Sequence, residues 1–184
     1  MPREIGLKRA RCDDITSYRR YISSLNGKSN LYTSLYSFRD RSREQPWKFD
    51  HNSAVIDRAW WDFDAGERGT IDEVKDDVAV LLERLDGDVR VVATGRGFHI
   101  HQIFSRPVVG HHFHQPLGRY QRSKAEGLKT LDGVAFPAKM ARIPGTYNVT
   151  RKRWAVSLPV DALRADIHGF SIPDTPKAEW AAYD

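Results

Sequence analysis

Residues 54–64 read AVIDRAWWDFD, and this stretch decides the fold. Branched and aromatic side chains dominate it, which indicates a β-strand that ends in acidic residues. Successive side chains of a strand point to opposite faces, so Asp62 and Asp64 are expected side by side. Trp61 and Phe63 would then turn into the core. The stretch therefore predicts a buried strand that presents two carboxylates at its end.

The segments that flank this strand predict further helices and strands. Thr70 caps an amphipathic helix that runs to about Leu85, with apolar side chains on one face. The turn of residues 94–97, Thr-Gly-Arg-Gly, joins two predicted strands, Val89–Ala93 and Phe98–Phe104. The other expected elements are a helix from Asp13 or Asp14 to about Leu25, a strand over Leu31–Phe38, a loop over Arg39–Asp50, a His-rich loop over Pro107–Pro116, a helix over about Leu117–Gly127, strands over Ile143–Asn148 and Trp154–Leu158, and a short helix near Asp161–Ala165.

Composition limits the classes of protein to which the chain can belong. Its 184 residues suit one domain, and 40% hydrophobic and 11% aromatic residues suffice for a core. Lys and Arg number 29 against 24 acidic residues, a formal charge of +5 that suits a polyanionic partner. The single cysteine, Cys12, excludes an internal disulfide and a Cys-only zinc site. No apolar run reaches the roughly 20 residues of a membrane helix, and Met1–Ala10 lacks the apolar stretch of a secretory signal, so a cytoplasmic protein without membrane partners is expected.

The acidic pair of the central strand indicates a metal site. Two neighbouring carboxylates repel each other, and a divalent cation relieves that repulsion. Hard oxygen ligands suit Mg²⁺ or Mn²⁺. The alternative for so short a motif is that Asp64 only opens a turn.

Two further segments carry charged groups that suit a metal–phosphate site. In the turn of residues 94–97, Gly95 and Gly97 let backbone N–H groups approach an anion, and Arg96 adds charge. His99 opens the next strand and could donate to a phosphate oxygen, although an ordinary hairpin with a glycine-rich turn explains the same residues. Asp132 supplies a third carboxylate, unless it is only a turn residue before a glycine. Arg142 suits bidentate contact to phosphate.

Taken together, WWDFD, TGRGFHIHQIF and TLDG resemble the archaeo-eukaryotic primase superfamily in order and rough spacing. The segment ARIPGTYNVTRKRW is similar to the Arg-Pro-Gly-Thr-Asn stretch of plasmid and viral primase-polymerases. The resemblance covers about Ser53 to Leu158. It implies an α+β fold within a single catalytic domain, residues 1–184. An N-terminal α/β unit would span about residues 1–55 and an RRM-like unit with a mixed or antiparallel sheet about 53–160, followed by a C-terminal tail.

The resemblance also implies an activity, template-directed joining of nucleoside triphosphates on single-stranded DNA by a two-metal mechanism. Asp62, Asp64 and Asp132 would bind two Mg²⁺ or Mn²⁺ ions. The incoming nucleotide would be held by Thr94, Gly95, Arg96, Gly97, His99, Arg142, Asn148 and Lys152. Single-stranded DNA would follow the basic side chains of Arg39, Arg41, Arg43, Arg151 and Arg153.

Partners and further metals follow from the same resemblance. A replicative helicase or accessory domain would be supplied separately, because the chain is too short to contain one. Many members carry a zinc-binding stem, which Cys12 alone cannot build, so zinc is not expected. His111, His112 and His114, together with His101, could bind a transition metal. The other interpretation is that the first three belong to an exposed loop without a metal.

Two other functions remain open at this stage. His99-Ile100-His101 fits the metal site of a His-hydrophobic-His rolling-circle nicking endonuclease, with Tyr120 or Tyr147 as nucleophile and a Tyr-x3-Lys spacing from Tyr120 to Lys124. The second alternative is a non-catalytic module that binds single-stranded DNA. Its support is the interleaving of Arg39, Arg41 and Arg43 with Phe38, Trp47 and Phe49.

Overall fold

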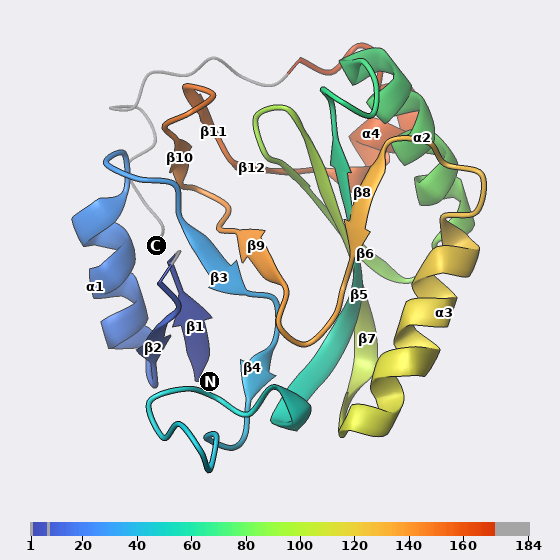
Figure 1. The fold of residues 1–184 in the computed structure, drawn as a ribbon. Coiled ribbons are helices and arrows are strands. Elements are labelled where there is room, and N and C mark those ends of the chain that lie inside the picture. Colours follow the sequence, from blue (N-terminus) through green and yellow to red (C-terminus); the bar gives the residue numbers. More distant parts are fainter. Residues whose placement is uncertain (1, 7, 172–184) are drawn as a thin grey trace.

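A computed structural model of the protein describes residues 2–6 and 8–171. It shows an α+β protein with antiparallel sheets, arranged as a larger unit and a smaller one side by side (Figure 1). No helix within the described residues combines the length and the apolar character that crossing a membrane requires.

The larger unit is built on the strand β5, Ala54–Asp64, as the sequence predicted. Its sheet has the order β12-β6-β7-β5-β4, and β8 pairs with β5 as well. Every pairing in this sheet is antiparallel. The other strands are β4 (Ser37–Phe38), β6 (Asp88–Ala93), β7 (Gly97–Val109), β8 (Leu131–Val134) and β12 (Val156–Leu158).

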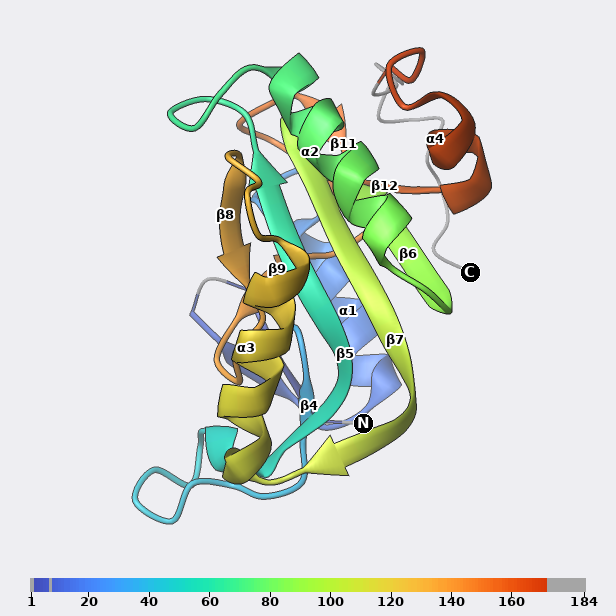
Figure 2. The ribbon, with the colours of Figure 1, turned by 90° about the vertical axis from the view of Figure 1, so that its right-hand side faces the viewer.

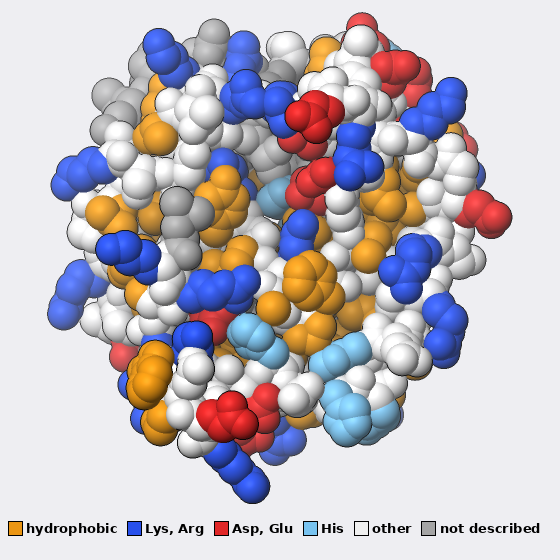
Figure 3. Space-filling view, in the orientation of Figure 1, with side chains coloured by type: hydrophobic (Ala, Val, Ile, Leu, Met, Phe, Trp, Pro, Cys, Tyr) orange, Lys and Arg blue, Asp and Glu red, His pale blue; other side chains and the backbone are white. Residues whose placement is uncertain are grey.

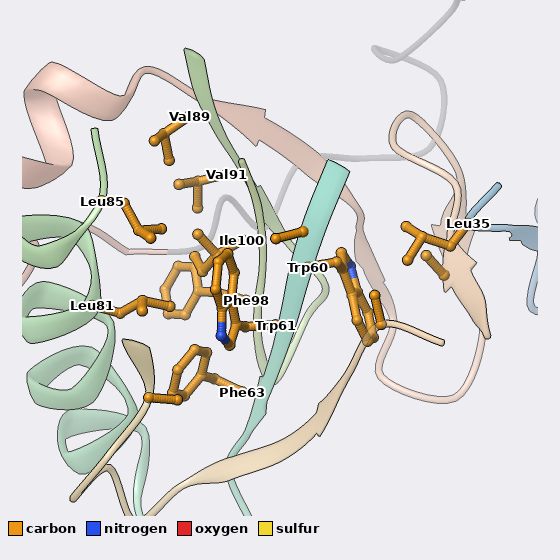
Figure 4. Packing of buried hydrophobic residues seen from close by; sticks show 14 of the residues in the cluster. Leu35, Trp60, Trp61, Phe63, Leu81, Leu85, Val89, Val91, Phe98 and Ile100 are labelled. Atoms are coloured by element: carbon orange, nitrogen blue, oxygen red, sulfur yellow. The ribbon is translucent and has the colours of Figure 1, made fainter. Parts of the chain in front are cut away.

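Two helices cover one face of this sheet, α2 (Ile71–Arg84) and α3 (His114–Lys124), with the short α4 (Val160–Asp166) beside α2 (Figure 2). Thr70 caps α2, as its sequence pattern predicted, and the structure adds a capping box with Glu73. Trp61 and Phe63 of β5 are fully buried on this helical side (Figure 4). The amphipathic face of α2 therefore holds the acidic end of β5 in place.

The smaller unit packs against the opposite face of the sheet. Its own sheet has the order β2-β1-β3-β9, and the helix α1 (Ile15–Leu25) begins at the cap residue Asp14. The strands are β1 (Arg3–Ile5), β2 (Ala10–Cys12), β3 (Tyr32–Ser34) and β9 (Met140–Arg142). Trp60, although it neighbours Trp61, is fully buried on this other side, toward Leu35 (Figure 4). The two units thus enclose both faces of β5.

Several elements differ from their predictions. The strand expected over residues 31–38 is two short strands in two sheets, β3 and β4, because the chain crosses between the units there. The prediction of a His-rich loop over Pro107–Pro116 was wrong, because β7 runs to Val109 and a 3-10 turn, His111–Phe113, leads into α3. Residues 143–148 form a turn and then the two-residue strand β10 (Tyr147–Asn148), which pairs with β11 (Arg153–Trp154). The end of the expected C-terminal tail, from residue 172, lies outside the described residues.

Candidate functional site

A polar pocket of about 280 Å³ lies where the acidic end of β5 meets the smaller unit. Figure 3 shows basic and acidic side chains meeting around a recessed histidine on this side of the molecule. The pocket is lined by Asn30, Tyr32, Asp62, Asp64, Thr94, Arg96, His99, Arg142, Asn148, Thr150 and Arg151. Seven of the residues predicted to bind metal or nucleotide are in this lining, namely Asp62, Asp64, Thr94, Arg96, His99, Arg142 and Asn148. Segments far apart in the sequence therefore converge on one pocket.

Strand register places the first three groups. Asp62 of β5 lies opposite His99 of β7, and Asp64 lies opposite Gly97. Paired residues of an antiparallel ladder share a face, and residues two apart on one strand do so too. Asp62, Asp64 and His99 therefore point to the same side of the sheet, away from the helices. This confirms that the two aspartates are neighbours on one face.

Asp62 is a largely buried carboxylate with cationic neighbours. His99 Nε2 lies 3.4 Å from its Oδ1, and Lys139 Nζ lies 3.8 Å from its Oδ2. Burial alone would favour the neutral acid, but the hydrogen bond with His99 and the charges of His99, Lys139 and Arg142 lower the pKa of the Asp62 carboxyl. Asp62 is therefore ionised at neutral pH.

Asp64 is held by the glycine-rich turn. Arg96 donates to it in a bidentate pair, with its Nε 2.7 Å from Oδ1 and its second contact from Nη2 to Oδ2. The hydrogen bond to Asp64, opposed by some desolvation, raises the pKa of Arg96, and the charges of Asp132 and Glu67 act in the same direction. The arginine predicted to meet phosphate thus neutralises a carboxylate of the same pocket.

Gly97 permits this arrangement. A Cβ built on Gly97 would lie 1.8 Å from the carbonyl oxygen of Phe63 in the paired strand. Gly95 has φ of +106°, which a residue with a side chain rarely adopts, and Asn148 Nδ2 donates to the carbonyl of Thr94 at 3.0 Å. Both glycines are therefore needed for the close turn rather than for direct contact with the pocket, whose lining does not include them.

Arg142 comes from the other unit, at the end of β9. Its guanidinium donates to Tyr32 Oη at 2.8 Å and to Asn30 Oδ1 at 3.3 Å, and it lies over the Tyr32 ring at 4.7 Å. Burial lowers the pKa of Arg142, although Tyr32 and Asp62 oppose that shift. The side chain is thus held rigidly, as a cation whose carboxylate neighbours lie across the pocket.

Three pocket residues and one neighbour were not predicted, and each has a structural explanation. Asn30, Tyr32 and Thr150 enter through the packing of the smaller unit, where Asn30 Nδ2 donates to Thr150 Oγ1 at 2.8 Å. Lys139 lies 4.8 Å from the centre of the Trp60 ring and close to Asp62. No local motif marks these positions. The Arg-Ile-Pro-Gly-Thr segment predicted only Arg142 as a site residue, and not the residues that surround it.

Other predicted site residues lie elsewhere. Asp132 is exposed, pairs with Arg68 at 3.0 Å and does not line the pocket, although β8 carries it next to the end of β5. Arg41 and Arg43 line a separate pocket in the loop before β5, and Arg39 is exposed. In the basic turn of residues 151–153, only Arg151 reaches the polar pocket; Lys152 is exposed, and Arg153 lines a neighbouring depression with Gly95.

The fit to a metal is partial. Two carboxylates on one face could hold a divalent cation, provided that Arg96 releases Asp64. Across residues 2–6 and 8–171, no group of three or more His, Cys, Asp or Glu side chains is placed to hold a metal ion. The three-carboxylate set that the resemblance implied is not assembled, because Asp132 is turned to Arg68.

The remaining histidine and tyrosine candidates are dispersed. His101 shares a face of β7 with His99, at a ring distance of 6.4 Å. His111 and His112 are exposed at the far end of β7. Tyr120 Oη donates to Gln102 at 2.6 Å, and its ring lies 6.4 Å from that of Trp61, which places it on the helical face of the sheet. Tyr147 packs against Trp154.

Comparisons of this chain with known protein families and with curated proteins found no match. The geometry of the site is therefore the basis for any functional conclusion.

Proposed function

We propose that this chain is a DNA primase-polymerase, which adds (d)NTPs to a growing strand on a single-stranded DNA template. The finer fold that accompanies this proposal is that of the archaeo-eukaryotic primase superfamily, an RRM-like sheet joined to a second α/β unit. One observation carries the proposal. Residues from the acidic strand, the glycine-rich turn and the Arg-Ile-Pro-Gly-Thr segment, separated along the chain, line a single pocket.

The mixed charge of the pocket supports a metal–triphosphate as its ligand. A free triphosphate would be repelled by Asp62 and Asp64, and a free divalent cation would be repelled by Arg96 and Arg142. A triphosphate that carries a divalent cation satisfies both sets at once. The pocket therefore suits a nucleotide bound with its metal better than either ion alone.

Each side chain has a part in binding such a substrate. Asp62 and Asp64 would hold the cation, Mg²⁺ or Mn²⁺, which would supply activation of a 3′-hydroxyl and neutralise the leaving pyrophosphate. Arg142, held by Tyr32 and Asn30, would bind phosphate oxygens from the opposite wall. Arg96 would exchange its pair with Asp64 for a phosphate. Asp132 would join the metal site only by leaving Arg68.

The nicking endonuclease is the second candidate, because His99 and His101 do share a face of β7. A tyrosine nucleophile would have to reach the same face, but Tyr120 lies on the helical face and Tyr147 does not line the pocket. The two functions are separated by mixing the protein with single-stranded DNA, Mn²⁺ and labelled nucleotides. We expect labelled DNA and no covalent adduct on a denaturing gel. An adduct that disappears in Tyr120→Phe or Tyr147→Phe, without incorporated label, would establish the endonuclease instead.

His99→Ala is expected to weaken nucleotide binding more than DNA binding. Its ring lines the pocket beside Asp62, and its Nδ1 is buried and without a hydrogen-bond partner among the described residues. Loss of a charge-assisted hydrogen bond to phosphate should reduce the binding free energy by about 1.5–3 kcal/mol. Calorimetric titration with a nucleotide and Mg²⁺ measures this change.

The matched control for this variant is His112→Ala, which removes an exposed histidine at the far end of β7. It should leave nucleotide affinity unchanged. Equal nucleotide affinities for the wild type and His99→Ala would assign His99 to the packing of Trp60, whose ring lies 4.9 Å away, and not to the substrate.

A further inference from the structure

A second cavity, of about 400 Å³, continues along the same sheet face from the polar pocket. It lies between the smaller unit and the strands β5, β6 and β7. Its lining is basic and includes Arg3, Arg58, Arg90, His101 and Arg142. Arg142 lines both cavities, so the two are neighbours on either side of one guanidinium.

Strand register shows how the two cavities follow each other. In the ladder, Val92 pairs with His99, and Arg90 pairs with His101. His99 lines the polar pocket, whereas its ladder partner Val92 and the next row, Arg90 with His101, line the basic cavity. Residues two apart on a strand are about 7 Å apart. A chain-like ligand bound in one cavity would therefore reach the other cavity with one further unit about 7 Å long.

The charge of the basic cavity is not balanced by its own carboxylates. Arg58 pairs with Asp57 at 2.8 Å, and Arg90 pairs with Asp88 at 2.8 Å. Arg3 donates only to the backbone carbonyls of Ser34 and Leu35 among its described hydrogen bonds, and no ion pair of the described residues includes Arg3 or Arg142.

Burial of these two cations has a cost that an anion would relieve. Burial, together with the charge of Arg58, lowers the pKa of Arg3, and burial also lowers the pKa of Arg142. Asp14 is the acidic side chain in the lining, and it is engaged in accepting a hydrogen bond from the backbone of Ser17 at 2.8 Å to cap α1.

His101 provides an independent sign of a missing partner. Its Nδ1 is a buried polar atom without a hydrogen-bond partner among the described residues. Buried polar groups of folded proteins are almost always paired, so an unpaired one at the wall of a cavity indicates a ligand or water. The nearby Tyr18, Leu35, Val92 and Pro144 add an apolar wall to the same cavity.

We propose that this basic cavity binds a nucleotide unit of the single-stranded DNA, with its phosphate between Arg3, Arg90 and Arg142. The lining suits a nucleotide, because its cationic groups would face a phosphate while its apolar wall would accommodate a sugar or base. The DNA strand would then lie directly beside the candidate nucleotide pocket. The choice of a DNA strand as ligand rests on the proposed function. The anion site itself rests on Arg3 and Arg142, which form no ion pair among the described residues, and Arg90 would exchange Asp88 for the phosphate.

The test measures binding without catalysis. Fluorescence anisotropy of a labelled oligo(dT) is followed with no nucleotide and no divalent metal, over a range of salt concentrations. Arg90→Gln changes an exposed side chain at the rim of the cavity, and Arg3→Gln changes a partly buried one. Each is expected to weaken binding about tenfold and to reduce the slope of log affinity against log salt by about 0.7, the value for one phosphate contact on a single strand.

Controls distinguish a local site from general charge and from loss of fold. Arg119→Gln removes an exposed arginine on α3, on the opposite face of the sheet, and should change neither affinity nor slope. Arg3→Lys keeps the charge and should restore most of the affinity that Arg3→Gln loses. If Arg3→Gln fails to fold, as judged by its thermal transition, Arg90→Gln alone decides.

Two outcomes overturn the inference. The cavity does not bind the DNA strand if Arg90→Gln and folded Arg3→Gln both bind oligo(dT) with the affinity of the wild type. A loss of dTMP binding in these variants, with oligo(dT) binding unchanged, assigns the cavity to a free nucleotide. Failure of the proposed function would look different, since no nucleotide addition would occur while the arginine dependence of DNA binding persisted.

Discussion

Asp62→Asn is expected to abolish nucleotide addition, with a fall in rate of roughly 10³-fold or more. The variant keeps the shape of the side chain but removes the charge that faces His99, Lys139 and the pocket. A neutral amide cannot balance a divalent cation, so the cation of the metal–triphosphate would lose the negative charge of Asp62. Incorporation of labelled nucleotide, measured at saturating substrate, gives the rate.

DNA binding by the same variant should survive, because the cationic side chains that we propose to contact phosphates are unchanged. Asp161→Asn, which changes an exposed carboxylate at the start of α4, is the control and should add nucleotides at the wild-type rate. Near-normal addition by Asp62→Asn would contradict the assignment of Asp62 to the metal site.

Gly97→Ala is expected to cause the largest loss of stability, about 3 kcal/mol or more. Its Cβ would lie 1.8 Å from the Phe63 carbonyl oxygen, and that oxygen belongs to the backbone of β5, which cannot rotate away. β5 and β7 would have to separate beside Asp64, where the sheet forms the pocket. Urea denaturation measures the change in the free energy of unfolding.

Gly133→Ala tests the other edge of the same strand. Gly133 pairs with Asp62 from β8, and its Cβ would meet only the flexible end of Lys139, at 3.0 Å. This control should lose about 1 kcal/mol or less, because the amine can move. If both variants unfold at the same denaturant concentration, the close approach at Gly97 does not constrain the sheet.

Local patterns in the sequence were sufficient to predict the centre of the larger unit. The branched and aromatic residues of 54–64 predicted a strand that ends in the acidic pair, and Thr70 predicted the beginning of α2. These elements are determined by interactions between near neighbours, which periodicity and capping record. The hairpin turn of residues 94–97 was found for the same reason.

Long-range pairing was not predictable in this way. β9 joins the sheet of the smaller unit through its pairing with β3, more than 100 residues earlier in the chain, and this pairing brings Arg142 beside Tyr32. The extension of β7 to Val109 depends on its pairing with β5 across a bulge between Ile56 and Arg58. Contacts of this kind leave no local signal, because both partners are short and of ordinary composition.

The same distinction applies to the site. Asp62, Asp64, Arg96 and His99 are placed by adjacent strands and one turn, and the structure brings them together. Asp132 is also near them along the ladder, but its side chain pairs with Arg68, from the loop before α2. Sequence spacing located the backbone of Asp132, whereas the direction of its side chain depends on a partner from elsewhere in the chain.

The central claim is that this pocket adds nucleotides under the direction of a template. The most direct measurement supplies unprimed oligo(dT) or oligo(dC), Mg²⁺ or Mn²⁺, and one labelled nucleotide at a time, and resolves the products on a denaturing gel. We expect labelled products with adenine nucleotides on oligo(dT), with guanine nucleotides on oligo(dC), and with neither in Asp62→Asn. If no labelled product forms on either template, or if the same nucleotide is incorporated on both, the account of this protein as a template-directed polymerase is contradicted.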